Sequence, residues 1–131
     1  FYEWKPAADG GPVNAKGKPL KQPVFVHRAD GRPLAVAGLW SAWKDPDGRF
    51  LHSATVITTA ANATMMPVHD RMPVVLPAQQ WALWLDPDNT DLDELGALLV
   101  GCDEGILTMH DVSTHVHNVR NNGPDLLQPS T

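Results

Sequence analysis

The feature that most constrains this fold is a run of β-branched side chains near the middle of the chain. Within residues 50–59 these side chains follow one another directly, as Thr55, Val56, Ile57, Thr58 and Thr59. Branching at Cβ limits side-chain rotation and suits the pleated surface of a sheet, so residues 50–59 predict a strand. The preceding Asp45-Pro46-Asp47-Gly48 predicts a turn. Any fold for this chain must therefore contain a sheet that accepts this strand.

Further strand signals lie on both sides of this run. Residues 24–28 predict a strand, Asp30-Gly31 a tight turn, and residues 34–40 the partner strand of a hairpin. Shorter strands are predicted at 74–76, 106–109 and 112–119. The pattern predicts an α+β fold that is β-rich, with a mostly antiparallel twisted sheet or open barrel and a few short peripheral helices.

The helical signals are short. Residues 60–66 predict a helical stretch that Pro67 ends, and Pro77 suits the first turn of another helix. Helical spacing then places three apolar side chains on one face, Trp81, Trp84 and Leu85. A capping-box pattern at Thr90 and Asp93 predicts a second helix that runs through Leu99.

Two segments are predicted to be loops. Residues 6–23 are rich in lysine, proline and glycine, and Asp9-Gly10-Gly11-Pro12 predicts a turn cluster within them. At the other end, Asn121-Asn122-Gly123-Pro124 closes the ordered part, and a short tail follows.

Length and charge limit the classes of function. The 131 residues suit one domain, residues 1–131, and no apolar run approaches the ~18 residues of a membrane span, so we expect no membrane partner. The net charge is −5. Bases exceed acids over residues 1–50, and acids exceed bases over residues 51–131. This asymmetry fits either a polyanion-binding face opposite an acidic back or two ordinary solvated surfaces.

Cys102 is the only cysteine, so no intrachain disulfide can form, which suits a reducing cytoplasm. It follows an apolar stretch and has no nearby cation to activate it. We interpret Cys102 as a small buried hydrophobe and not as a nucleophile.

Glu3 lies between two aromatic residues, Tyr2 and Trp4. A carboxylate desolvated there would be prepared for general acid–base work near neutral pH. Alternatively, strand alternation directs Glu3 to solvent while Tyr2 and Trp4 face the core. The residues alone leave both interpretations open.

The tripeptide His69-Asp70-Arg71 lies in a segment braced by Pro67 and Pro73. A carboxylate partner can fix the tautomer of a histidine for proton transfer, and arginine offers a forked donor to phosphate. A salt-bridged turn without catalytic function explains the same residues equally well.

His110, His115 and His117 could bind zinc if the last two share one strand face. Against this, the spacing matches neither a structural zinc site nor a hydrolytic zinc motif.

Phosphate-cradling glycine loops and serine nucleophile elbows are also absent from the sequence. We interpret four tryptophans as core or interface residues, Trp40, Trp43, Trp81 and Trp84.

Several short stretches, in order along the chain, resemble the motifs of one family. They are Phe1-Tyr2-Glu3-Trp4, Lys21-Gln22-Pro23 leading into Val24-Phe25-Val26, Ala37-Gly38-Leu39-Trp40, Ile57-Thr58-Thr59-Ala60-Ala61-Asn62, His69-Asp70-Arg71-Met72-Pro73 and Val119-Arg120-Asn121-Asn122-Gly123-Pro124-Asp125-Leu126. The series resembles the SRAP domain, the SOS response-associated peptidase family, over the length of the chain.

The resemblance implies a protein of the SOS and DNA-damage response that binds single-stranded DNA and captures abasic sites covalently. In the family, removal of the initiator Met exposes a cysteine whose α-amine and thiol trap the sugar aldehyde as a thiazolidine. Glu3 and His69 match the family's catalytic acid–base residues. Trp4, Thr58 and Arg71 match positions at or near the DNA. We expect no metal and no other cofactor, and a cytoplasmic protein that joins the nucleoid when bound to DNA.

This sequence departs from the family at its start, because the family's amino-terminal part with the nucleophilic cysteine is absent. Cys102 does not match that cysteine. We therefore expect residues 1–131 to be a domain that lacks its N-terminal portion, with peptidase and crosslinking activity belonging to the complete protein. A non-catalytic interaction fragment is the alternative, followed by a histidine-metal hydrolase.

Overall fold

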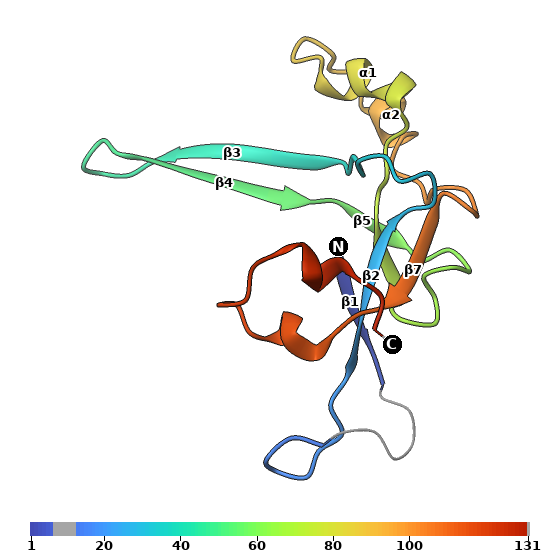
Figure 1. Cartoon of the computed structure of the whole chain (residues 1–131). Coiled ribbons are helices and arrows are strands. Elements are labelled where there is room, and N and C mark those ends of the chain that lie inside the picture. The colour runs from blue at the N-terminus through green and yellow to red at the C-terminus, as the bar shows by residue number, and fades with distance from the viewer. Residues whose placement is uncertain (7–12, 131) are drawn as a thin grey trace.

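A computed structural model describes residues 1–6 and 13–130 (Figure 1). The predicted turn cluster at residues 9–12 lies outside them. The strands are β1 (Tyr2–Lys5), β2 (Gln22–Arg28), β3 (Gly38–Lys44), β4 (Phe50–Val56), β5 (Thr58–Ala60), β6 (Arg71–Pro73) and β7 (Leu107–Asp111). The helices are α1 (Trp81–Leu85) and α2 (Leu92–Gly96), with 3-10 turns η1 (Ala78–Gln80), η2 (Thr114–His117) and η3 (Pro124–Leu127). Antiparallel strands with short helices confirm the predicted class, and the sheets are open.

Three strands form one antiparallel sheet in the order β1-β2-β7. The register pairs Glu3 with Val24, and Val24 with Asp111. Directly opposed residues project from the same face of a sheet, so these three share one face. Tyr2 and Phe25 are paired and share the opposite face.

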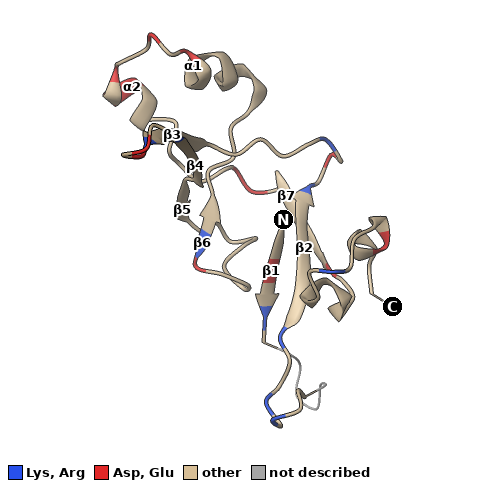
Figure 2. Cartoon of the chain, turned by 90° about the vertical axis from the view of Figure 1, so that its left-hand side faces the viewer, with Lys and Arg blue, Asp and Glu red and all other residues tan. Residues whose placement is uncertain are grey.

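The Glu3 face of this sheet packs on a core to which β6 contributes. The buried members of this core are Val26, Met65, Met72, Val75 and Leu107. Met72 belongs to β6, which pairs with β5, and Phe1 packs against the same cluster. Figure 2 shows β6 beside β1. The core therefore brings the segment before β6 and the start of β1 to one side of the sheet.

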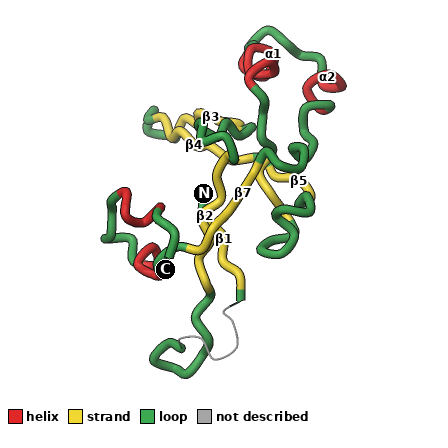
Figure 3. Tube along the Cα trace, turned by 45° about the vertical axis from the view of Figure 1, so that its right-hand side comes forward, coloured by secondary structure: helices red, strands yellow, loops and turns green. Residues whose placement is uncertain are grey.

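The β3–β4 hairpin projects from this body (Figures 1 and 3). Its strands pair from Gly38–Val56 to Lys44–Phe50, and the predicted turn closes it, with the Asp45 amide donating to the Arg49 carbonyl at 2.8 Å. Apart from Gly38, every residue of the two strands is exposed. The exposed apolar side chains are Leu39, Trp40, Trp43, Phe50, Leu51 and Val56. Core positions for Trp40 and Trp43 are therefore wrong, whereas an interface function stays a prediction.

The predicted hairpin between residues 24–28 and 34–40 is wrong. The Asp30-Gly31 turn exists, with Gly31 at φ +72° and its amide bonded to the Arg28 carbonyl at 3.1 Å. However, both edges of β2 are taken by β1 and β7, and Pro33 has no amide hydrogen for a ladder. The returning segment instead enters β3, whose partner is β4.

The predicted strand at 50–59 exists but divides at Ile57. Its first part pairs with β3 and its second part, β5, pairs with β6. At the division, the Ile57 amide donates to the Ala37 carbonyl and the Val74 amide donates to the Ile57 carbonyl, both at 2.9 Å. One continuous β-branched run therefore serves two sheets.

Local signals also misplaced short elements around β6. In place of the helix predicted at 60–66, Ala60 ends β5 and residues 63–68 form hydrogen-bonded turns, and the strand lies at 71–73 in place of 74–76. Residues 74–76 are buried, and Val75 forms an isolated bridge with Val36. Burial on the core, which the neighbouring sequence does not specify, decides these boundaries.

Trp84 of α1 packs on a second core of Ala37, Val74, Leu76 and Leu98, and Leu98 lies just after α2. Trp81 and Leu85 remain exposed, so the predicted apolar face is only partly buried. Helix α2 is capped by Asp91 and not by Thr90, because the Asp91 carboxylate accepts from the Asp93 and Glu94 amides. The helix ends at Gly96, before the predicted Leu99.

The C-terminal segment returns to the sheet. Residues 114–117 form the 3-10 turn η2, so the strand predicted at 112–119 is wrong. The Ser113 hydroxyl caps this turn by accepting from the His115 amide. Beyond it, the predicted tail packs on the Tyr2 face, where the Tyr2 hydroxyl donates to the Leu126 carbonyl at 3.3 Å. None of the helices in the described ranges has the length and apolar character of a membrane span.

Candidate functional site

Three of the predicted site residues form one hydrogen-bonded group at the start of β6. The Arg71 guanidinium donates through Nη2 to the Thr58 carbonyl oxygen at 2.6 Å and to Thr58 Oγ1 at 2.9 Å. The Arg71 amide donates to His69 Nδ1 at 2.9 Å. Thr58 and Arg71 are a diagonal pair on the β5–β6 ladder, on the face opposite Met72. Strand pairing therefore fixes the exposed guanidinium beside the histidine.

The backbone, and not the neighbouring carboxylate, orients the His69 ring. Because Nδ1 accepts from the Arg71 amide, the neutral ring carries its proton on Nε2. Asp70 Oδ1 also lies 3.2 Å from Nδ1. The two contacts need different states of Nδ1: a hydrogen bond to Asp70 requires a proton on Nδ1, whereas acceptance from the Arg71 amide requires its free lone pair. Because the amide can only donate, its bond is the stronger constraint. The His69 side chain is 46% exposed, and within the described residues no hydrogen bond occupies its Nε2.

Glu3 lies on the core side of the β1-β2-β7 sheet. Its partner Val24 is 1% exposed, and Glu3 itself is half-buried. On the same face, Lys5 Nζ and Asp111 Oδ1 form an ion pair at 2.7 Å across β2. Of the two interpretations of Glu3, the partly desolvated carboxylate is the one that this register supports. Within the described residues, no hydrogen bond joins Glu3 to the group around Arg71.

Trp4 lies on the opposite face of β1 from Glu3, since strand residues alternate. Its indole stacks on the His117 imidazole, with ring centroids 6.2 Å apart and planes at 28°. Trp4 is 37% exposed. The structure therefore places Glu3 with the Arg71 side of the sheet and Trp4 with the C-terminal segment.

Cys102 is half-buried and packs against the first core. Burial raises the pKa of its thiol, and the nearby Asp103 and Glu104 charges raise that pKa further. The thiol therefore stays protonated at neutral pH, as expected for a structural residue and not for a nucleophile.

The histidines of the C-terminal half do not converge. His110 Nε2 lies 2.8 Å from the Leu127 carbonyl, His117 stacks on Trp4, and His115 is in the same 3-10 turn as His117 and not on a strand. In the described part of the chain, no three His, Cys, Asp or Glu side chains gather to hold a metal. The histidine-metal arrangement fails because the strand on which it depended is absent.

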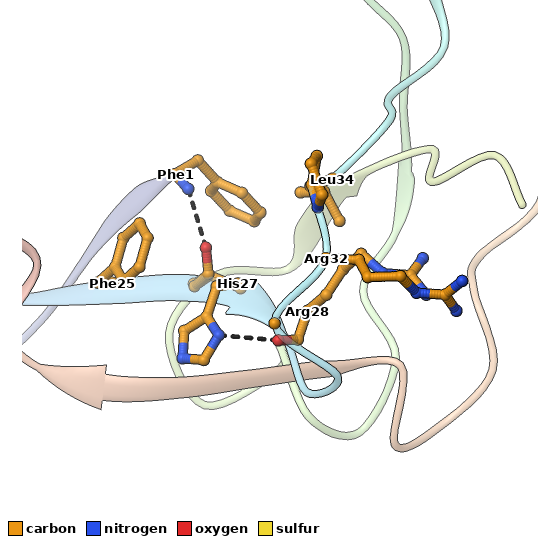
Figure 4. A pocket seen from close by; sticks show the side chains of 9 residues that line it. Phe1, Phe25, His27, Arg28, Arg32 and Leu34 are labelled. Carbon is orange, nitrogen blue, oxygen red and sulfur yellow. Dashed lines mark hydrogen bonds between the residues drawn. The ribbon is translucent and has the colours of Figure 1, made fainter. Parts of the chain in front are cut away.

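Sequence reasoning missed a pocket at the end of β2, shown in Figure 4, which Phe1, His27 and Leu34 help to line. Arg28 and Arg32 both donate to the Asp30 carboxylate, at distances of 2.6–2.9 Å. Hydrogen bonds from the Arg28 guanidinium, then from the Arg32 amide and guanidinium, hold the pKa of Asp30 well below its usual range. No periodic sequence pattern indicates this pocket, because the pocket combines the end of a strand with a turn.

Figure 2 shows acidic residues around α1, α2 and their connection, and basic residues at the end of β1 and in the segment before β2, toward the other end of the molecule. Together these features define a class: a β-rich protein with open sheets, in which one sheet carries a half-buried carboxylate and the next carries an exposed histidine and arginine at its start.

Comparison with known proteins identifies the class more closely. The family model described as SOS response associated peptidase (SRAP) matches residues 1–119. The chain is 36% identical over 128 residues to the abasic site processing protein YoqW of Bacillus subtilis, covering 98% of this chain and 53% of that protein. It is 33% identical over 136 residues to the abasic site processing protein HMCES of Xenopus tropicalis, covering 97% and 40%.

A crystal structure of a protein from Bacteroides thetaiotaomicron shares the fold, with a TM-score of 0.79 and 21% identity, over 100% of this chain and 53% of that chain. The chain belongs to the SRAP family. It spans about half the length of YoqW.

Proposed function

We propose that this chain supplies the acid–base and DNA-contacting part of an SRAP domain that captures abasic sites in single-stranded DNA. Family membership carries the proposal, because the relatives it matches are abasic site processing proteins. The exposed group of Thr58, His69 and Arg71 supports it. The protein would act in the cytoplasm and join the nucleoid on damaged DNA.

The proposed chemistry is condensation of an aldehyde with an amine and a thiol. The open-chain sugar aldehyde reacts with the α-amine of an N-terminal cysteine, forms an imine and releases one water. The cysteine thiol then adds across the imine, which closes a thiazolidine ring. Removal of the initiator Met by the same protein would expose that cysteine.

Glu3 and His69 are the proposed acid–base residues for these steps. The partial burial of Glu3 beside Val24 supports its use in proton transfer. The open Nε2 of His69 supports donation of a proton to an oxygen of the sugar. Ring opening, loss of water and reversal each need such a transfer.

DNA contact is assigned to Arg71, Thr58 and Trp4. Arg71 uses one nitrogen on Thr58 and keeps further donors for a phosphate. Trp4 offers an indole of which His117 covers one side. A guanidinium and an aromatic ring suit single-stranded DNA, where phosphates and unstacked bases are both accessible.

The active domain, in this proposal, also needs polypeptide beyond residues 1–131. The half-length match to the relatives and the exposed apolar hairpin support this. The hairpin equally favours the alternative, a non-catalytic interaction module that binds another protein.

Crosslinking tests the proposal. A complete SRAP protein that contains this chain would be incubated with single-stranded oligonucleotides, with and without one abasic site, and with the matched duplex. A denaturation-resistant adduct is expected with the abasic single strand alone, and it should vanish when the N-terminal cysteine is replaced. Failure to form an adduct with any of these oligonucleotides would support the interaction module.

A further inference from the structure

One carboxylate outside the predicted site holds the segment that carries His69. Glu104 Oε1 accepts from the Ala63 amide and Oε2 accepts from the Thr64 hydroxyl, both at 2.7 Å. The residues are about forty positions apart in sequence, so this is a tertiary tether. A second bond beside it joins Asn62 Nδ2 to the Cys102 carbonyl at 3.2 Å.

The tethered residues are part of a compact turn that ends at His69. The Asn62 carbonyl accepts from the Met65 and Met66 amides, and the Met65 carbonyl accepts from the Val68 and His69 amides, at 2.9–3.1 Å. Met65 is completely buried in the first core. One end of the turn is thus fixed by Glu104 and its middle by Met65, and the backbone position of His69 follows from both.

The same chain of bonds continues into the site. His69 Nδ1 accepts from the Arg71 amide, and the Arg71 guanidinium binds Thr58. A displaced turn would therefore move both the imidazole and the donor that selects its tautomer. Buried Met65 and Met72 anchor the segment on the core at two points, and Glu104 anchors its exposed beginning.

We propose that Glu104 is a positioning residue for His69. This inference rests on the proposed function, since it assigns a use to the orientation of that histidine. Glu104 acts through the backbone: its hydrogen bonds fix residues 63–64, and thereby the turn that presents the His69 imidazole. No local sequence pattern indicates this tether, because it links two loops about forty residues apart.

Hydrogen bonds from Thr64 and then Ala63 lower the pKa of the Glu104 carboxyl below its ordinary value. A carboxyl whose folded pKa is depressed stabilises the fold above its unfolded pKa, and this stabilisation is lost as the pH falls through the folded pKa. At neutral pH the tether is therefore ionised and intact. Acidification is expected to loosen residues 62–69 before it loosens β2 and β7.

Native-state hydrogen exchange on the isotope-labelled complete protein that contains this chain tests the tether without DNA. Glu104→Ala should speed exchange of the His69 and Arg71 amides about tenfold, while the Val26 and Met109 amides keep their rates. Glu104→Gln retains an acceptor and should give an intermediate rate. Asp103→Asn removes the adjacent charge, which makes no such bonds, and should match the wild type.

Thr64→Val tests the other side of the bond. The effects of Thr64→Val and Glu104→Ala on exchange should not add, because Glu104→Ala already removes the hydrogen bond that Thr64→Val removes. Uniformly faster exchange across all amides in Glu104→Ala would mean a general loss of stability and would overturn the positioning function. Unchanged exchange at His69 and Arg71 would overturn it too.

The catalytic consequence is measured in the complete protein. Glu104→Ala should slow adduct formation about tenfold at saturating abasic DNA, with affinity for undamaged single strands unchanged. Full wild-type rate in Glu104→Ala would overturn the proposal. Failure of the wild type to form any adduct would instead refute the proposed function, and the exchange data would still decide whether Glu104 positions His69.

Discussion

The body around the β1-β2-β7 sheet and the β3–β4 hairpin both contain large apolar side chains but use them differently. In the body, Val26, Met65 and Met72 are 0–1% exposed. In the hairpin, Trp40 is 75% exposed and Leu51 62%. The body is held by burial, whereas the hairpin is held by its backbone ladder and its turn.

This difference shows which region carries the candidate site. His69 and Arg71 adjoin the buried Met65 and Met72, so the core fixes their backbone. The hairpin reaches the body through Gly38 and Ile57 and contributes no predicted catalytic residue. A two-stranded hairpin is marginal alone in water, so its large apolar surface suits contact with further polypeptide.

The largest effect is expected in the body. Met72→Ala should lower the free energy of unfolding by about 2–5 kcal/mol, because it removes a fully buried side chain and leaves a cavity. Urea unfolding followed by tryptophan fluorescence measures this. Met72→Leu, of similar volume, is the control and should cost less than about 1.5 kcal/mol.

A smaller loss is expected at the base of the hairpin. A Cβ at Gly38 would lie 2.9 Å from the Thr55 carbonyl oxygen, closer than van der Waals contact allows. Gly38→Ala should therefore cost about 1–3 kcal/mol as β3 and β4 shift apart. The same unfolding experiment applies, with Gly96→Ala as the control, because space around Gly96 is open.

The smallest effect is expected along the hairpin surface. Trp40→Ala should change the free energy of unfolding by at most about 1 kcal/mol, since it removes an exposed side chain whose cross-strand neighbours are Ala54 and His52. If Trp40→Ala destabilised the chain as much as Met72→Ala does, the hairpin would be buried in solution and the contrast between the two regions would be wrong.

Sequence patterns anticipated the class of fold because strand propensity and turn chemistry are local. They located β2, β7 and the Asp45–Gly48 turn closely. They failed where strand pairing depends on residues far apart in sequence. The run at 50–59 divides at Ile57 between two sheets, and β2 pairs with β7 and not with residues 34–40. The strand at 112–119 failed because Ser113 caps a 3-10 turn there.

The candidate site shows the same difference between features that local sequence predicts and features that depend on long-range contacts. The motif resemblance named Thr58, His69 and Arg71, and the structure joins them by hydrogen bonds. The neighbours Tyr2 and Trp4 do not determine whether Glu3 faces the core or solvent. The register of β1 with β2 determines it, because it pairs Glu3 with Val24. Glu104 was missed because its partners lie about forty residues away.

The most direct test of the account is the rate of adduct formation on abasic single-stranded DNA by variants of the complete protein. Glu3→Gln and His69→Ala should each slow the rate at least about 100-fold, as expected for loss of a general acid or base. Asp103→Asn should leave that rate within about twofold of the wild type, because, within the described residues, the Asp103 carboxylate makes no hydrogen bond to the turn that carries His69. Wild-type rates in both Glu3→Gln and His69→Ala would contradict the assignment of the site to the body.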